Sequence, residues 1–258
     1  MNEAEYRDML MERFINGHKE YNPEYIYKYL DFNGGYLSLK NLNIQFSHPY
    51  TFSDLTECRK FRIKFKNKGK RIKDSLLDES LNRFNTPISV NIENIRNKSY
   101  REIELFTEHN WEKITLEKAG IACFTTLANS TFHWNNYADK HNGICVKYNF
   151  MKLLTHFENS SFFYYWNNQS LIHGPIIYLD EIIPISYGDD FKLLMLQNWI
   201  YVKKITYAEE KEYRIYSQNC DLNKQIARIG IDRACIENVY FGSNVSSDNI
   251  ARINDLGF

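Results

Sequence analysis

The chain has 258 residues, a formal net charge of zero, 43% hydrophobic residues and 25% charged residues. This length allows a substantial buried core, and the composition is that of a globular protein. Zero net charge argues against attraction of the whole molecule to nucleic acid or to an anionic membrane. Apolar runs fall short of the ~20 residues of a membrane helix. The polar N-terminus does not have the pattern of a signal peptide, so we expect a cytoplasmic protein without membrane contact.

The first part of the chain predicts two strands between helices. Apolar residues recur at helical spacing over residues 3–15. The β-prone run 25–29 predicts the first strand. A short helix is expected over 36–42, and alternating apolar residues predict a second strand over 43–47 that Pro49 ends.

Residues 60–118 are strongly charged, and their apolar positions fit helix faces. We therefore predict a charged helical insertion over 60–118 that covers part of the core.

The remainder of the chain alternates strand and helix patterns. Strands are expected over 120–124, 144–148, 174–179, 181–187, 212–216 and 236–241, and helices over 151–157 and 189–201 and from Ser246 onward. This mixture predicts an α+β fold, with residues 1–258 forming a single domain around a twisted, mostly antiparallel mixed sheet.

Polar and aromatic side chains are dense over residues 133–143, between two predicted strands. Such groups are costly to place unless they form hydrogen bonds or bind a ligand. On one helix, His133 and His141 would share a face and could suggest a metal site. Alternatively, His141 caps the helix, and Trp134 and Tyr137 belong to the core. The five cysteines are not closely paired, so we expect reduced thiols and no metal site.

Several motifs follow one another in a distinctive order. They are Tyr27-Lys28-Tyr29; Phe46-Ser47 with Pro49, Phe52, Asp54 and Glu57; Cys123-Phe124; Trp134, Tyr137, Ala138, His141 and Gly143; and Glu210, Glu212, Tyr213 and Arg214. This ordered set resembles the bacterial domain of unknown function 2971, over about residues 25–249. The name of that family carries no activity, so this resemblance implies no reaction.

A looser similarity, at the level of the fold, is to the ADP-ribosyltransferases. It depends on a short first strand, a helix, a strand ending in Phe-Ser, and a late strand that bears Glu. In those enzymes a late-strand Glu supports cleavage of the nicotinamide–ribose bond of NAD. The similarity therefore implies Glu212 as the catalytic carboxylate, with Glu210 second, and NAD as a substrate rather than a bound cofactor. A carboxylate there would stabilise positive charge on the ribose. Similar folds suggest phage defence as a context.

We expect further candidate residues to bind such a nucleotide. Aromatic rings could stack on nicotinamide or adenine, and Lys28 or Arg214 could hold phosphate. The substrate-binding candidates are Lys28, Tyr29, Ser47, Asp54, Trp134, Tyr137, His141 and Arg214.

Two alternatives stay open. Glu212 could instead belong to a structural row of ion pairs with Arg214 or Lys28. The protein could also be a non-enzymatic module that binds nucleic acid or a protein partner. Its contacts would then come from the basic segment 59–73 and the aromatic loop 162–168.

Overall fold

A computed structural model describes residues 1–20, 22–52, 58, 63–64, 99, 102, 105, 119–158, 172–183, 185–186, 198–217 and 225–258. Its largest sheet consists of β1 (Tyr25–Leu30), β2 (Asn43–Ser47), β4 (Gly120–Thr125), β5 (Ile144–Asn149), β6 (Ile172–Pro175), β10 (Glu212–Ser217), β11 (Ile226–Gly230) and β12 (Ile236–Phe241). The strand pairs of this sheet are antiparallel.

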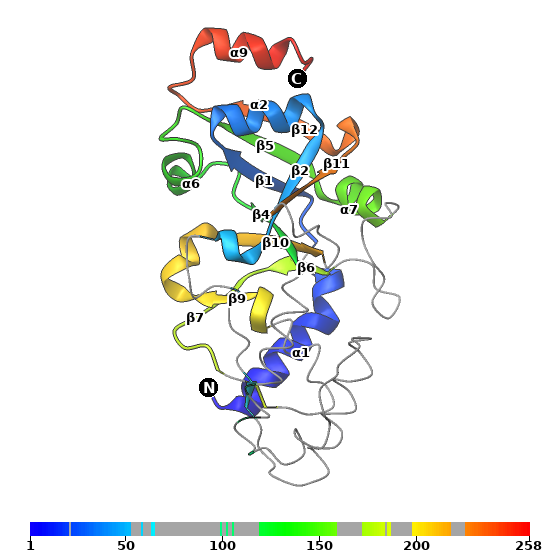
Figure 1. Cartoon of the computed structure of the whole chain (residues 1–258), viewed down its shortest axis with the longest axis vertical. Helices are drawn as coiled ribbons and strands as arrows, with labels where there is room; N and C mark the ends of the chain where they lie inside the picture. The colour runs from blue at the N-terminus through cyan, green and yellow to red at the C-terminus, as the bar shows by residue number, and fades with distance from the viewer. Residues whose placement is uncertain are drawn as a thin grey trace.

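Helices lie on both sides of the main sheet in Figure 1, and the described residues also form two small parallel sheets. The helices are α1 (Glu3–Glu20), α2 (Phe32–Lys40), α6 (Thr131–Asn136), α7 (Phe150–Glu158) and α9 (Ser247–Asn254), and the 3-10 helices are η1 (Pro49–Thr51), η2 (Ile205–Glu210) and η4 (Arg233–Cys235). The small sheets pair β3 (Ile63–Lys64) with β8 (Ile185–Ser186), and β7 (Ile177–Leu179) with β9 (Val202–Lys204). The predicted α+β class and the mostly antiparallel sheet are confirmed.

Six predicted strands are found to within one residue of their bounds: β1, β2, β4, β5, β10 and β12. Strand β2 alternates buried and partly buried residues, whereas β10 is buried along its whole length and β4 everywhere except Cys123. The strand predicted over 174–179 is divided at Ile176 into β6 and β7, which join different sheets. The strand predicted over 181–187 is limited to β8 within the described residues, and β9 and β11 were not predicted.

Most of the predicted insertion 60–118, and most of the helix predicted over 189–201, lie outside the described residues. No described helix is long and apolar enough to cross a membrane.

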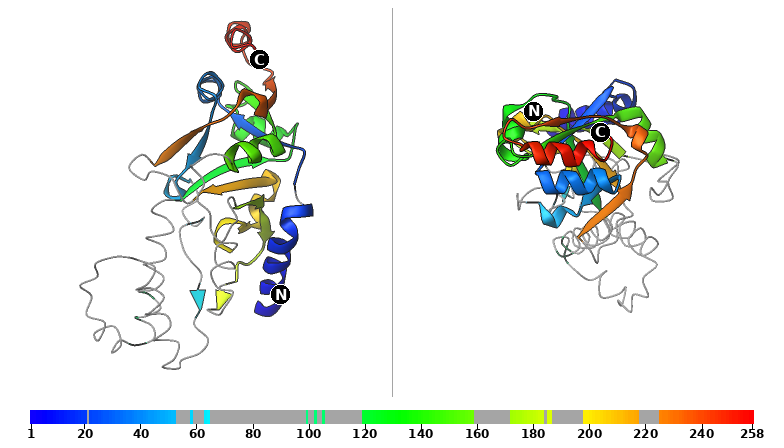
Figure 2. Two further views of the ribbon diagram at one scale, coloured as in Figure 1. Left: turned by 90° about the vertical axis from the view of Figure 1, so that its right-hand side faces the viewer. Right: turned by 90° about the horizontal axis from the view of Figure 1, so that it is seen from above.

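The main core lies between one face of the sheet and helices α2, α7 and α9. Phe157 of α7 packs edge to face on Phe46 of β2, with ring centroids 5.8 Å apart. Helix α9 lies alongside α2 above the sheet (Figure 2). On the opposite face, Tyr216 packs with Trp199 in a second cluster, and Tyr6 of α1 joins a third. The segment β4–β10 is therefore covered on both faces.

The sheet divides beside β4. Strand β10 pairs with β4 from Glu212↔Thr125 to Ser217↔Gly120, and so occupies one whole edge of β4. The other edge is shared, because β1 pairs with it only at Thr125 and β2 only at Ile121. Strands β1 and β2 therefore diverge from β4 as a fork, and α2 connects them. The fork leaves room for a cavity beside β4.

Candidate active site in the sheet fork

A cavity of about 880 Å³ occupies the fork. Its volume is within the range of roughly 300–1,000 Å³ of small-molecule sites. Side chains from β1, α2, β2, β4, α6, η2, β10 and β11 line it. Both halves of the chain therefore contribute to this cavity.

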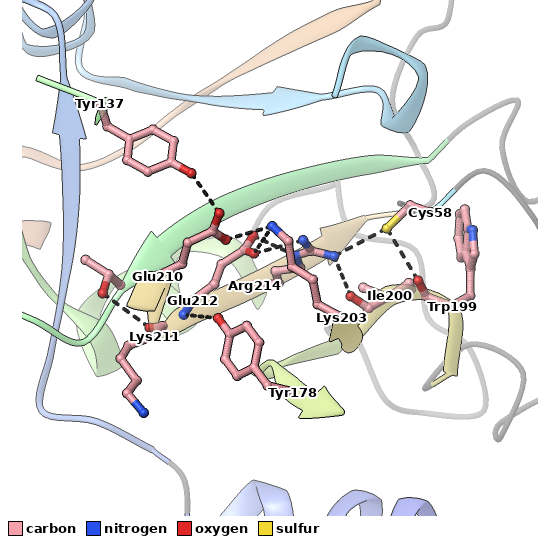
Figure 3. A network of polar contacts seen from close by, with 11 residues as sticks. Cys58, Tyr137, Tyr178, Trp199, Ile200, Lys203, Glu210, Lys211, Glu212 and Arg214 are labelled. Carbon is pink, nitrogen blue, oxygen red and sulfur yellow. Dashed lines mark hydrogen bonds and ion pairs between the residues drawn. The ribbon is translucent and has the colours of Figure 1, made fainter. Parts of the chain in front are cut away.

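Glu212 and Arg214, which both line the cavity, form a buried bidentate ion pair (Figure 3). They are two residues apart on β10, so they share a face of the sheet. Arg214 donates from Nε to Glu212 Oε1 over 2.7 Å and from Nη2 to Oε2 over 2.9 Å. Its Nη1 donates to the Ile200 carbonyl at 2.7 Å and contacts Cys58 Sγ at 3.3 Å. Because the guanidinium is 1% exposed, these contacts fix it rigidly.

Glu210 extends the network toward the cavity. It is the last residue of η2, just before β10, and its carboxylate lies close to that of Glu212 (Figure 3). Lys203 Nζ donates to Glu210 Oε2 at 2.7 Å and lies 3.5 Å from Glu212 Oε2. Tyr137 of the α6 C-cap donates its hydroxyl to Glu210 Oε1 at 3.0 Å. One ammonium therefore bridges two carboxylates.

The two carboxylates differ in their pKa. Burial alone would raise the pKa of Glu212, but the Arg214 guanidinium, helped by Lys203, lowers it to about 2. Burial raises the pKa of Glu210, and the negative charge of Glu212 adds to this, while Lys203 opposes it. Glu212 is therefore a fixed anion, whereas Glu210 binds a proton more readily.

Lys28 of β1 points into the fork. Its Nζ donates to the carbonyl of Cys123 at 2.8 Å and lies 5.1 Å from the ring centroid of Phe124. Cys123 is on β4 between the residues that pair with β1 and β2. Burial lowers the pKa of Lys28, because a desolvated ammonium is costly.

Aromatic side chains line the cavity beside α6. The His133 ring stacks on Tyr29 with centroids 5.0 Å apart, and lies 5.6 Å from that of Tyr137. Ser130 caps α6, and its Oγ lies 2.8 Å from His133 Nδ1. Burial lowers the pKa of His133, which favours the neutral imidazole. These rings form an uncharged surface next to Glu210.

Six of the predicted site residues line the cavity: Lys28, Tyr29, Tyr137, Glu210, Glu212 and Arg214. Trp134, His141 and Ser47 do not line it. Trp134 is buried behind Tyr29, and His141 stacks on Trp134 at 5.7 Å. Ser47 accepts a hydrogen bond from Gln45, which does line the cavity.

Other predicted features fall outside the described residues. They are Asp54, almost all of the basic segment 59–73, and the aromatic loop 162–168.

Sequence reasoning did not identify Lys203, Tyr207, Gln45 and Arg228 as lining residues. Lys203 is on the three-residue strand β9 and had no motif around it. Arg228 is directly opposite Gln45 in the pairing of β11 with β2. An alternation of Arg228 with Ala227 and Ile229 was the only available signal for it.

The two histidines do not share a helix face. Helix α6 ends at Asn136, and a turn with positive φ at Asp139, Lys140 and His141 follows it. The described residues contain no group of three or more His, Cys, Asp or Glu side chains arranged to hold a metal ion.

The model of a family described as "Protein of unknown function (DUF2971)" matches residues 133–215. This match confirms the predicted relation to that family over this part of the chain. The matched range includes Tyr137, Lys203, Glu210, Glu212 and Arg214, but not the motifs on β1, β2 and β4. No curated protein and no solved structure matches the chain. The similarity to ADP-ribosyltransferases stays a prediction.

Proposed function

We propose that this chain, with its DUF2971 region, is an enzyme that cleaves the N-glycosidic bond of a nucleotide, most concretely NAD. The reaction would be hydrolysis or ADP-ribosyl transfer. The observation that carries the proposal is a pair of buried carboxylates, Glu210 and Glu212, beside aromatic rings in a cavity of about 880 Å³. Positive charge develops on the ribose when this bond breaks, and a fixed negative charge stabilises it.

In hydrolysis, the bond from ribose C1′ to nicotinamide breaks, and its electron pair leaves with nicotinamide. A new bond forms from C1′ to the oxygen of water, and the water loses a proton. In transfer, a nucleophile on an acceptor takes the place of water. Either reaction requires negative charge next to C1′, and a group that accepts a proton assists it.

Glu210 suits the substrate-facing role better than Glu212, although the sequence motif favoured Glu212. Both oxygens of Glu212 are bound to Arg214, and its pKa of about 2 leaves it a poor base. The pKa of Glu210 is raised, and its Oε1 faces the hydroxyl of Tyr137. We assign charge stabilisation and proton acceptance to Glu210, and we assign to Glu212 the role of holding Arg214 and Lys203.

The aromatic rings beside Glu210 provide a surface for the leaving group. Tyr29, His133 and Tyr137 line the cavity, and the neutral His133 does not repel a cationic nicotinamide ring. Stacking on such rings is typical of base and nicotinamide recognition.

The test is nicotinamide release from NAD, followed by chromatography with the purified full-length protein. We expect Glu210→Gln to reduce the rate by about 10²–10³-fold, as in the removal of other charge-stabilising groups. Glu209→Gln is the matched control, because Glu209 is the adjacent, exposed carboxylate and does not line the cavity. It should retain the wild-type rate.

Absence of nicotinamide release by the wild-type protein would overturn the proposal. Gel-shift assays with RNA and DNA at two salt concentrations accompany the test. Salt-sensitive binding without turnover would favour the alternative role as a nucleic-acid-binding module.

A further inference from the structure

The cations that line the cavity fall into two groups. Lys203 and Arg214 form ion pairs with Glu210 and Glu212. Lys28 and Arg228 do not form an ion pair with a carboxylate of the described residues. The positive charge of the second group is therefore not neutralised locally.

The third carboxylate of the lining, Asp31, is engaged elsewhere. Its Oδ1 accepts a hydrogen bond from the backbone N–H of Gly34 at 2.9 Å and caps α2. Glu212 attracts Lys28 only from beyond ion-pair distance, and Arg214 already binds both of its oxygens. Neither Asp31 nor Glu212 therefore forms an ion pair with the ammonium of Lys28.

The charged side chain of Lys28 lowers the stability of the fold when the cavity is empty, because its hydrogen bonds are incomplete. Lys28 is half-buried and its ammonium has three N–H donors, but among the described residues it has one hydrogen-bond acceptor, the carbonyl of Cys123. A methionine in its place would pack on Phe124 without that cost. The position therefore keeps a positive charge that the fold does not require.

Arg228 provides a second, exposed donor in the cavity lining. It is on β11 opposite Gln45 of β2, so both side chains project from the same face of that ribbon. Both line the cavity, and Arg228 is exposed. A guanidinium is planar and binds phosphate oxygens in a bidentate manner, and an amide N–H₂ can donate to another oxygen.

We infer that Lys28, Arg228 and Gln45 form a phosphate subsite, and that the cavity takes a phosphorylated substrate such as a nucleoside diphosphate. This inference rests on the proposed function, because it names the substrate class of the same cavity. The phosphates would lie between β1 and the β2–β11 ribbon, and the reacting ribose would face Glu210 beside Tyr29. The phosphates of the nucleotide would thus contact cationic side chains, and its reacting ribose would contact a carboxylate.

The experiment is isothermal titration of the full-length protein with ADP, AMP and adenosine, in the absence of NAD. We expect binding to strengthen from adenosine to AMP to ADP, and the preference for ADP to decrease at high salt. Arg228→Gln and Lys28→Met should each weaken ADP binding by about ten-fold or more, as expected for the loss of a charged hydrogen bond. Adenosine binding should change little.

Lys204→Gln is the matched control, since Lys204 is exposed on β9, does not line the cavity and gives the same change in net charge. It should bind ADP like the wild type. Thermal unfolding separates the two roles of Lys28. If it recognises phosphate, Lys28→Met keeps or raises the melting temperature. If Lys28 only joins β1 to β4 through the Cys123 carbonyl, Lys28→Met lowers the melting temperature and leaves ADP binding unchanged, which overturns the inference.

The two proposals can fail separately. ADP binding that depends on Lys28 and Arg228, without nicotinamide release from NAD, supports the subsite and overturns NAD cleavage. Nicotinamide release by a protein that binds adenosine and ADP equally overturns the subsite and leaves the reaction standing.

Discussion

Two glutamates of one network differ in how strongly the stability of the fold depends on them. Glu212 is held by both arms of a guanidinium that is 1% exposed, whereas Glu210 is bound by the hydroxyl of Tyr137 and by Lys203. Removing one partner of a buried ion pair leaves the other charge uncompensated. Without Glu212, the buried guanidinium of Arg214 would have neither its ion pair nor contact with water. Without Glu210, Lys203 would still have the carboxylate of Glu212 at 3.5 Å.

We therefore expect Glu212→Gln to reduce the free energy of unfolding by roughly 3–5 kcal/mol. Glu210→Gln should cost about 1 kcal/mol or less, because burial already disfavours its charged form. Urea denaturation of both variants measures the difference. A Glu210→Gln variant that unfolds as easily as Glu212→Gln would show that both carboxylates are structural.

At the scale of elements, the turn after α6 fixes the aromatic side of the cavity. Gly143 donates its N–H to Ala138 and lies against the end of β1. A Cβ at this position would fall inside contact distance of the Leu30 carbonyl oxygen and of Ala138. Backbone atoms cannot move away as a flexible side chain can, so only glycine lets the turn approach β1 this closely.

Gly143→Ala should destabilise the protein by roughly 1–3 kcal/mol, the usual cost of overpacking. Gly230→Ala is its control, because a Cβ there meets nothing within 4 Å. The melting temperatures of the two variants provide the test. We also expect weaker nicotinamide release from Gly143→Ala, since the turn positions α6 and with it His133 and Tyr137. Equal melting temperatures would contradict the close packing of the turn on β1.

The elements that alternation marks clearly were predicted from the sequence, and the fork was not. Strands β1, β2 and β10 have local runs of apolar and β-prone residues, although β10 proves to be buried on both faces. The fork depends on two strands sharing one edge of β4, which is a non-local pairing without a local pattern. Strand β11 was missed for a related reason. Its Ala227 and Gly230 weaken the alternation, and its partner β2 is distant in sequence.

The site shows the same limit. Glu210, Glu212 and Arg214 were identified because a motif groups them, and β10 places the last two on one face. Lys203, which joins the carboxylates, is on a short strand whose place depends on parallel pairing with β7. Trp134 and His141 share a motif with Tyr137, but the left-handed turn after α6 packs them behind Tyr29. Motif membership thus predicted proximity to the site, but not which side chains face the cavity.

For the whole molecule, the opposite pKa shifts predict a stability maximum. The pKa of Glu212 falls from 4.5 to about 2 on folding, so its stabilisation is complete above 4.5 and is lost as the pH falls toward 2. The pKa of Glu210 is raised above 4.5, so the folded state binds this proton more tightly than the unfolded chain. Its contribution therefore declines as the pH rises from 4.5 through the raised pKa. Stability should increase up to about pH 4.5 and then decrease slightly.

Variants assign each side of this maximum to one residue. In urea denaturation across the acid range, Glu212→Gln should flatten the rise of the free energy of unfolding with pH, and Glu210→Gln should flatten its decline.

Nicotinamide release should depend on pH in a different way, because the reaction requires ionised Glu210. Its rate should rise over the same range in which Glu210 makes the fold less stable. A rate that follows stability, or a decline that persists in Glu210→Gln, would mean that another group titrates in the cavity. A rate that rises while the stability contribution of Glu210 falls would instead show that the charge on Glu210 is kept for the reaction at a cost to the fold.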